Sequence, residues 1–380
     1  MDRVTFHHDT VLSDVHLLLP NTRHLMTRLN HVGQPVFMSR FRILSEPGPG
    51  PEAEGPSGGG AEHADPPLDE DGDYDVTRRP RRGCSGRGVV GPVLVSRSDP
   101  DLGGLEEKEE EGGEEGSIRI EHTMATPLED VGKQVWRGAL LLADFILSRP
   151  DAFRGATVLE LGAGTGLTSV VMATTAKRVY CTDVGEDLLS MCEKNVTLNR
   201  PLLLRSGADV RVRHLDWLQD RLRADADSAF SWTQEEEEDL HGNASIIVAA
   251  DVCYEDDLTD GFFLTLRRLL AAFARPPTVF IAIERRMNFT LRHLNVSCEA
   301  YDRFIRRLFQ LGDLREGPRR FRVEQVLTDF PQFLFYERVE QLELWKVTVT
   351  PAQSPAQSPT QSPTPQEPEV VQVHEEEDYH

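Results

Sequence analysis

The chain contains 380 residues, of which 39% are hydrophobic, and it carries a formal net charge of −22. This length suffices for one large domain or two modest ones, whereas the low apolar fraction indicates that part of the chain lies outside any packed core. The acidic balance argues against direct nucleic-acid binding, which depends on counterion release by basic side chains, and it is compatible with a basic partner.

The five cysteines are widely spaced and include no C-x-x-C pair, so we expect neither a disulfide framework nor a zinc or other metal site. The first residues, MDRVTFHHDT, lack the apolar stretch of a signal peptide, and no apolar run is long enough to span a bilayer. We therefore expect a soluble protein of the nucleus or cytoplasm, monomeric and without a membrane association.

The N-terminal part of the chain divides into two segments. Residues 1–45 contain three short runs typical of β-strands, separated by turn formers at Pro20-Asn21 and Gly33, and should form an ordered N-terminal β arm. Residues 46–117 are dominated by Gly, Pro and Glu. They contain too few large apolar side chains to offset the entropy lost on ordering, so we predict a disordered linker.

Residues 118–350 alternate apolar strand-like runs with longer amphipathic stretches, which is typical of βαβ units around a parallel sheet. Strands are predicted at 156–161, 178–182, 210–215, 245–250, 278–283, 321–327 and 342–349. Helices are predicted at 132–148, 165–175, 186–199, 257–274 and 298–311. No helix pattern separates the last two strands, so they should form an antiparallel hairpin at the sheet edge. The predicted class is α/β, with a Rossmann-like, seven-stranded, mostly parallel sheet.

The C-terminal segment, residues 351–380, repeats a Gln-Ser-Pro unit before it turns acidic. Such a composition is extended and polar, and it has almost no apolar side chains to bury. We predict a disordered tail.

The segment V-L-E-L-G-A-G-T-G-L carries the strongest functional pattern. An apolar strand runs directly into Gly162, Gly164 and Gly166, which let the backbone turn sharply and approach a ligand without an intervening Cβ. A dinucleotide fingerprint, G-x-G-x-x-G, needs a glycine where this chain has Leu167, so a nicotinamide dinucleotide is disfavoured. Glu160 suits an amino-acid ammonium better than a pyrophosphate. Structural turns of this composition also exist without ligands, but the flanking strand and helix favour a nucleotide-type ligand.

Acidic residues end the next two strands. Asp183 can accept two hydrogen bonds from ribose hydroxyls, and it can equally serve as a helix N-cap. The following strand ends in Asp216 and Trp217, where an indole can stack on an adenine while Asp216 or nearby backbone binds the adenine amino group. A buried core tryptophan is the alternative for Trp217.

The fourth strand, S-I-I-V-A-A-D, ends at Ala250 and opens onto Asp251-Val252-Cys253-Tyr254. In an open α/β sheet, ligands lie outside the carboxyl ends of the strands, so Asp251 and Tyr254 should face the reacting centre. The N-P-P-Y motif of many enzymes that methylate exocyclic or amide nitrogens is absent from the sequence. One carboxylate and one phenol stand in its place, and packing alone is the alternative for Tyr254.

Taken together, these motifs resemble the seven-β-strand class I methyltransferases and, within them, family 16, which is rich in protein lysine methyltransferases. The resemblance covers about 118–349 through E-L-G-A-G-T-G, the acid at Asp183, D-W, the (D/E)-x-x-(Y/F) motif as D-V-C-Y, and E-R-R at 284–286. It implies S-adenosyl-L-methionine as cofactor, contacted by Trp136, Gly162, Ala163, Gly164, Asp183, Trp217 and Ala250. It also implies a protein substrate with an accessible lysine, for which a basic nuclear protein would suit the acidic charge, and it places Asp251 and Tyr254 on the substrate side.

A lysine ammonium, with a reference pKa near 10.4, must lose a proton before its nitrogen can attack a methyl group. A sulfonium cation and a desolvated tunnel both lower that pKa, so the proton can leave to solvent without a strong general base. In-line positioning then contributes about 7 to 11 kcal/mol by intramolecular analogy. We expect Asp251 to hold the amine and Tyr254 to shape the pocket or donate to a carbonyl. The E-R-R segment either orders a substrate loop or forms a surface charge cluster.

Two other functions stay open at this point. A non-catalytic S-adenosylmethionine-binding scaffold in a protein complex fits every pattern except the D-V-C-Y segment. A methyltransferase acting on RNA is disfavoured by the negative charge and by the missing N-P-P-Y motif.

Overall fold

The computed structural model describes residues 10–13, 15, 26–29, 35–43, 93–94, 117–219, 222, 228–290, 295–313 and 319–351. The predicted linker and C-terminal tail lie outside these residues, except for 93–94, 117 and 351. Among the described residues, no helix is both long enough and apolar enough to cross a membrane.

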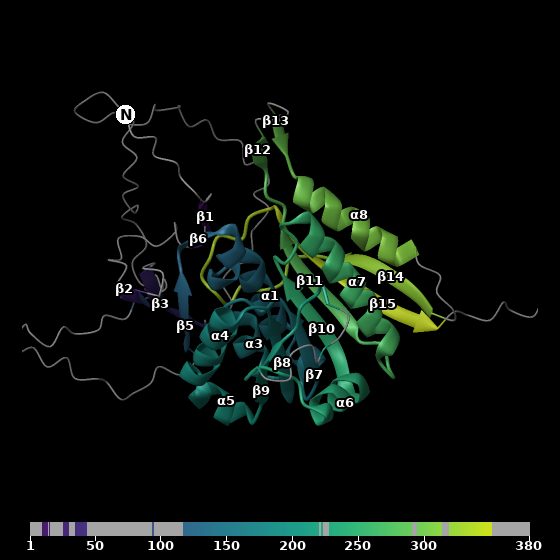
Figure 1. Ribbon diagram of the computed structural model, residues 1–380, viewed down its shortest axis with the longest axis horizontal. Coiled ribbons are helices and arrows are strands. Elements are labelled where there is room, and N and C mark those ends of the chain that lie inside the picture. The colour runs from purple at the N-terminus through teal and green to yellow at the C-terminus, as the bar shows by residue number, and fades with distance from the viewer. Residues whose placement is uncertain are drawn as a thin grey trace, which may run out of the picture.

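The central sheet has seven strands in the order β14-β15-β11-β10-β7-β8-β9 (Figure 1). In chain order these are β7 (Thr157–Leu161), β8 (Arg178–Asp183), β9 (Asp209–His214), β10 (Ala244–Ala250), β11 (Thr278–Glu284), β14 (Arg319–Val326) and β15 (Leu342–Pro351). The strands from β11 through β9 pair in parallel, whereas β15 is antiparallel to both β11 and β14. The predicted Rossmann-like sheet and its antiparallel C-terminal hairpin are confirmed.

Helices cover both faces of this sheet, because its strands are apolar on both sides. One face packs against α1 (Arg137–Ser148), α2 (Pro150–Phe153), α3 (Leu167–Met172), α4 (Glu186–Leu198) and α5 (Arg200–Ser206). The other packs against α6 (Gln234–Asn243), α7 (Asp256–Ala272) and α8 (Glu299–Asp313). In α7 the buried Phe262, Leu266 and Leu269 recur at helical spacing and form the apolar stripe that faces the sheet.

The predicted helix at 132–148 is wrong in its first turn. The 3-10 helix η2 (Leu128–Lys133) ends there, and the chain is extended at Gln134 and Trp136 before α1 begins at Arg137. The amide of Gln134 explains the break, because it bonds to backbone and side-chain groups outside the helix. Its Nε2 donates to the carbonyl of Val11 at 2.8 Å and to Thr126 Oγ1 at 2.8 Å.

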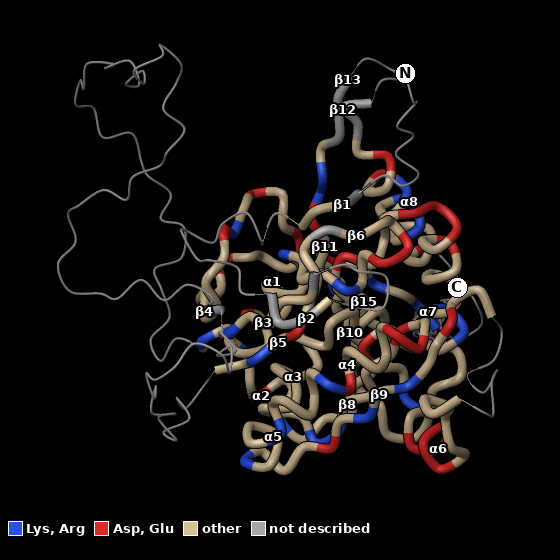
Figure 2. Tube along the Cα trace, turned by 60° about the vertical axis from the view of Figure 1, so that its left-hand side comes forward, with Lys and Arg blue, Asp and Glu red and all other residues tan. Residues whose placement is uncertain are grey.

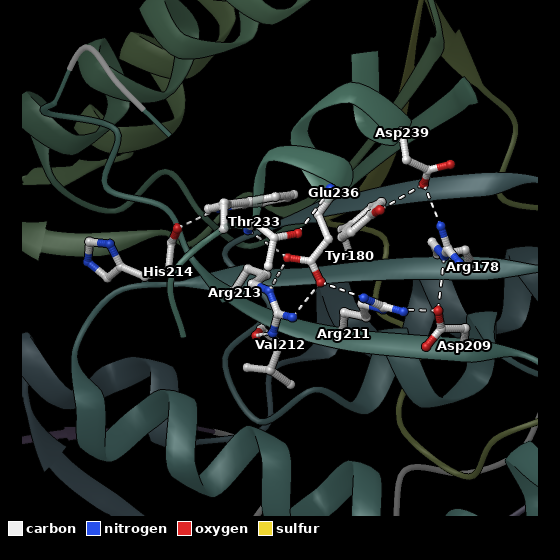
Figure 3. A network of polar contacts seen from close by, with 11 residues as sticks. Arg178, Tyr180, Asp209, Arg211, Val212, Arg213, His214, Thr233, Glu236 and Asp239 are labelled. Atoms are coloured by element: carbon white, nitrogen blue, oxygen red, sulfur yellow. Dashed lines mark hydrogen bonds and ion pairs between the residues drawn. The ribbon is translucent and has the colours of Figure 1, made fainter. Parts of the chain in front are cut away.

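Helix α6 was not predicted, because Leu240 is its one large apolar side chain and the sequence therefore shows no apolar period. A capping box between Thr233 and Glu236 starts this helix instead. Figure 3 shows how α6 is tied to the sheet: Glu236 accepts hydrogen bonds from Arg211 and Arg213 of β9, both at 2.7 Å. Burial raises the pKa of Glu236, but the two guanidiniums outweigh it and lower this pKa to about 2.

The N-terminal strands form two small sheets beside the main one. Strand β1 (Thr10–Leu12) pairs with β6 (Ala125–Pro127), and β3 (Pro35–Arg42) pairs with β2 (Met26–Leu29), β4 (Val93–Leu94) and β5 (Ser117–Thr123). A further hairpin joins β12 (Asn288–Thr290) to β13 (Asn295–Ser297).

Asn195 of α4 and Asn199, the residue directly after α4, take the place of a neighbouring strand along the free edge of β5. Asn195 accepts from the N–H of Glu121 at 2.7 Å and donates to its carbonyl at 2.9 Å. One helical turn later, Asn199 does the same with Arg119, at 2.9 and 2.7 Å. Asn195 also donates to the carbonyl of Thr165 at 2.9 Å, so the edge of β5 is connected directly to the glycine-rich turn.

Candidate active site

The glycine-rich turn lies between β7 and α3, and it needs glycine for two separate reasons. Gly162 and Gly164 have φ angles of +70° and +54°, a region that side chains with a Cβ rarely adopt. A Cβ on Gly162 would also lie 2.6 Å from Val252 Cγ1 and 3.1 Å from Trp217 Cη2, and one on Gly164 would lie 2.8 Å from the carbonyl oxygen of Gly132. The turn is therefore in close contact with three other segments of the chain.

A cavity of about 560 Å³ opens over this turn, within the range of small-ligand sites. Its lining includes the eleven predicted catalytic and cofactor-binding residues: Trp136, Glu160, Gly162, Ala163, Gly164, Asp183, Asp216, Trp217, Ala250, Asp251 and Tyr254. Most of them follow or end the adjacent strands β10, β7, β8 and β9, so the sheet order brings them to one edge. Trp136 comes from the N-cap of α1.

Glu160 lies within the central strand β7 and is only 2% exposed. Its Oε2 accepts a hydrogen bond from the hydroxyl of Ser169 in α3. Burial raises the pKa of this carboxyl to about 7, against the opposing effect of Ser169 and Thr168. A half-ionised acid therefore sits beneath the glycine turn, where a cationic ligand group would draw it into the charged form.

Asp183 supports the turn from the neighbouring strand. Its Oδ2 accepts from the N–H of Gly164 at 2.7 Å and its Oδ1 from the N–H of Val184 at 2.8 Å. The N-cap of helix α4 is instead Gly185, without a side-chain hydrogen bond, so Asp183 does not act as its N-cap. Burial raises the pKa of Asp183, and the two N–H donors lower it in part. Each oxygen retains a lone pair for a ribose hydroxyl.

Asp216 and Trp217 play different parts. The carboxylate of Asp216 accepts from the N–H of Leu218 at 2.8 Å and from Gln219 Nε2 at 2.9 Å, so it holds the turn after β9. Trp217 is half-buried, with its ring edge-to-face on Phe262 at a centroid distance of 5.3 Å. Its indole Nε1 is buried and finds no hydrogen-bond partner among the described residues. Trp217 is thus not a fully buried core residue, and the described part of the chain leaves its indole N–H without an acceptor.

Asp251 is the only non-glycine residue with a positive φ in the described part of the chain, at +53°. Its side chain is 3% exposed. It accepts from the N–H of Gly138 at 2.7 Å and from the N–H of Glu284 at 2.8 Å, which joins the start of α1 to the end of β11. A Cβ on Gly138 would lie 2.6 Å from Asp251 Oδ2, so any other residue there would have to displace the Asp251 carboxylate. Asp251 therefore holds the frame of the site, whatever else it binds.

Tyr254 is 37% exposed and lines the same cavity. Burial of its hydroxyl, reinforced by Asp183, raises the pKa of the phenol to about 12. The group is therefore a neutral hydrogen-bond donor throughout the physiological pH range.

A second cavity, of about 680 Å³, adjoins the first on the side of β11 and α8. The two share six lining residues: Val11, Leu128, Trp136, Asp251, Tyr254 and Arg286. Asp251 and Tyr254 thus stand where the two cavities meet.

Several lining residues were not found from the sequence, notably Val131, Gly132 and Gln134 around η2, Leu188 of α4, and Val11 of the N-terminal arm. The continuous helix predicted at 132–148 hid the η2 group. Gly132 was an available signal, because a glycine inside a helix costs about 1 kcal/mol relative to alanine. Val11 carries no such signal, since its place depends on the long-range pairing of β1 with β6.

Known proteins with similar sequences identify the family of this chain. A family model described as lysine methyltransferase matches residues 114–300. Methyltransferase-like protein 22 of Mus musculus is 51% identical over 390 residues, which cover 93% of this chain and 99% of that protein. The chain belongs to the lysine methyltransferase family. Methyltransferase-like protein 22 of Homo sapiens is 50% identical to this methyltransferase, over 92% of this chain and 97% of its own. The resemblance to family 16 is confirmed.

Among solved structures, magnesium protoporphyrin IX methyltransferase from Synechocystis, with SAH bound, is similar with a TM-score of 0.35 and 13% identity, over 56% of this chain and 83% of that chain.

The cofactor of this methyltransferase is S-adenosyl-L-methionine, and the larger features of the first cavity fit it. Gly162 and Gly164 line the cavity, and Asp183 has lone pairs for ribose hydroxyls. The buried Glu160 suits an ammonium group. The Nε1 of Trp217, a buried donor without an acceptor in the described ranges, can be satisfied by a ligand or water.

Proposed function

We propose that this methyltransferase transfers the methyl group of S-adenosyl-L-methionine to lysine side chains of non-histone proteins. The observation that carries the proposal is the junction of the two cavities, where Trp136, Asp251 and Tyr254 belong to both. One cavity is lined by the glycine turn, and the other opens toward β11 and α8. A long, thin side chain reaching through the second cavity would meet a ligand in the first at these three residues.

The cofactor site in this proposal consists of the first cavity's predicted residues: Trp136, Glu160, Gly162, Ala163, Gly164, Asp183, Asp216, Trp217 and Ala250. Asp183 would bind the ribose, Glu160 the amino-acid ammonium, and the face of Trp217 the adenine. Each carboxylate oxygen of Asp216 already accepts one hydrogen bond within the turn after β9. Asp216 can therefore bind the adenine only through the lone pairs that remain.

When bound, the cofactor supplies an electrophilic methyl group on a sulfonium sulfur. The protein has to bring a neutral amine into line with it, exclude water, and let one proton depart. Asp251 and Tyr254 are the proposed substrate-side residues: the carboxylate attracts the ammonium, and the neutral phenol donates to the substrate backbone or shapes the wall. Because the phenol keeps its proton at physiological pH, we assign it no role as a general base.

The charge of the surface agrees with a basic partner. Four acidic residues line the first cavity. They lie in the first turn of η2 (Glu129 and Asp130) and of α4 (Glu186 and Asp187). Figure 2 shows further acidic segments near β6, β11 and α8, around the same end of the molecule. A protein carrying a lysine in a basic region would be attracted to this end by its charge.

We also propose that this methyltransferase is located in the nucleus or the cytoplasm. The described cysteines Cys181, Cys192, Cys253 and Cys298 are free thiols, as is usual in a reducing compartment.

The proposal is tested by incubating the full chain and radiolabelled S-adenosyl-L-methionine with a cell extract treated with protease or nuclease. We expect protease-sensitive, nuclease-resistant label that mass spectrometry assigns to the Nε of lysine in non-histone proteins, and none with Asp183→Ala. Nuclease-sensitive label would favour the RNA alternative. Saturable cofactor binding without any transfer would favour the non-catalytic scaffold.

A further inference from the structure

The side chain of Arg286 stands at the junction of the two cavities and lines both. Its guanidinium carbon lies 4.2 Å from the centroid of the Trp136 ring, a cation–π contact. Its Nη2 is 3.4 Å from Asp251 Oδ2, and its Nε is 3.5 Å from Glu284 Oε2. A cation of the protein itself is therefore held between an aromatic face and two carboxylates, at the place where the two cavities meet.

This cation is held loosely in comparison with its neighbour. Arg137 reaches Glu284 at 2.8 Å, with side chains only 9% and 8% exposed. The side chain of Arg286 is 34% exposed, both of its ion-pair contacts are long, and its Nη2 makes no hydrogen bond to any described residue. Arg286 also lies two residues beyond the end of β11, so its side chain can swing away without breaking the sheet.

The two buried carboxylates, Asp251 and Glu284, are contacted by two guanidiniums, of which Arg137 also contacts the exposed Glu337 at 3.4 Å. If Arg286 swings out, Asp251 keeps its hydrogen bonds from Gly138 and Glu284, and Glu284 keeps Arg137. One negative charge then lacks its cation at a pair of carboxylates that are only 3% and 8% exposed, beside the half-buried Trp136 ring. An incoming alkylammonium restores the balance, so its entry exchanges one cation for another and exposes no buried charge.

We propose that the alkylammonium of the target lysine binds in the position of the Arg286 guanidinium, between the Trp136 ring and the carboxylates of Asp251 and Glu284, and that Arg286 is a gate which must leave first. The inference rests on the proposed lysine specificity for its biological meaning. The gate gives the E-R-R segment at the end of β11 a role on the substrate side. Glu284 is part of the ammonium site, and Arg286 occupies that site when no substrate is bound.

The experiment uses n-butylammonium, which has the four-carbon chain and head group of lysine, and the full chain saturated with S-adenosylhomocysteine. Its affinity is measured by calorimetry for wild type, Arg286→Met and the matched control Arg285→Met. Arg285 carries the same charge one residue away but lies 5.9 Å from the Tyr301 ring instead. If Arg286 occupies the site at least four-fifths of the time, its removal strengthens n-butylammonium binding at least fivefold. Arg285→Met should change it less than twofold.

Adding Trp136→Leu to Arg286→Met should abolish the gain. In the wild type, the Nε–H resonance of Arg286 should be shifted upfield by the indole ring and move toward its free value as n-butylammonium is added. The gate would be overturned if wild type and Arg286→Met bound n-butylammonium with equal affinity, or if Arg285→Met gained as much affinity as Arg286→Met. It would also be overturned if the Arg286 resonance did not move when n-butylammonium saturates the protein. None of these measurements involves methyl transfer, so they stand or fall separately from the proposed lysine activity.

Discussion

Replacing Glu160 by Gln should make the protein more stable at high pH, because the carboxyl lies in the central strand β7 at 2% exposure. Gln has nearly the same shape and can still accept the hydrogen bond from Ser169. Burial raises the pKa of Glu160 from 4.5 to about 7 in the folded protein. The folded state therefore binds the proton more tightly than the unfolded state does.

The sign and size of the effect follow from this difference. A raised carboxyl pKa has no effect on stability below about pH 4.5, where both states are protonated, and it costs stability increasingly from there to about pH 7. A shift of about 2.5 pKa units at about 1.4 kcal/mol per unit corresponds to a cost of about 3 kcal/mol above pH 7. Glu160→Gln removes that cost, so the variant should be more stable than wild type by up to about 3 kcal/mol at pH 8 and equally stable at pH 4.5.

Urea denaturation followed by tryptophan fluorescence at several pH values measures these free energies of unfolding. Glu235→Gln, an exposed glutamate in the first turn of α6, is the control and should change stability by less than about 0.5 kcal/mol at every pH. The same Glu160→Gln variant should bind S-adenosyl-L-methionine more weakly, since it lacks the charge proposed for the ammonium. Parallel stability curves for wild type and Glu160→Gln from pH 4.5 to 8 would refute the reasoning.

Three further substitutions probe the site and its support. Asp183→Ala should weaken cofactor binding in calorimetry at least tenfold, and an unchanged dissociation constant would remove this side chain from the ribose role. Asp251→Ala should abolish methyl transfer and leave the cofactor affinity nearly intact, and an equal loss of transfer and affinity would contradict its role on the substrate side. The same substitution should lower the free energy of unfolding by about 2 to 4 kcal/mol, because two backbone N–H groups lose their acceptor. Asn195→Ala removes partners from three backbone groups and should lower the free energy of unfolding by about 2 to 4 kcal/mol, whereas a loss under 1 kcal/mol would show that water replaces the amide.

The candidate site was predictable to the extent that its residues follow strands of a parallel sheet. Gly162, Asp183, Trp217 and Asp251 each lie at or just after the carboxyl end of a strand, and the parallel order of the strands brings such positions together at one edge. The predicted contacts were less reliable than the predicted positions. Asp216 uses both of its oxygens to hold its own turn, a short-range pattern that the sequence did not distinguish from a ligand contact.

The break between η2 and α1 illustrates why other parts were not predictable. Local propensity allows one helix through 132–148, but the bonds from Gln134 to Val11 and Thr126 favour an extended chain there. The partners of Gln134 lie 123 and 8 residues away along the chain. No periodicity within a window of helix length contains such information.

The sequence alone determined the alternation of strands and helices, the glycine turn and the acids that follow the strands, since apolar period and backbone freedom are properties of short segments. Only the tertiary structure decided that Asp251 joins α1 to β11, that β5 is held by Asn195 and Asn199, and that Arg286 lies on Trp136 between two cavities. Each of these depends on where distant segments meet. That meeting is set by the packing of the whole sheet with its helices, and the same local patterns are compatible with many different contacts.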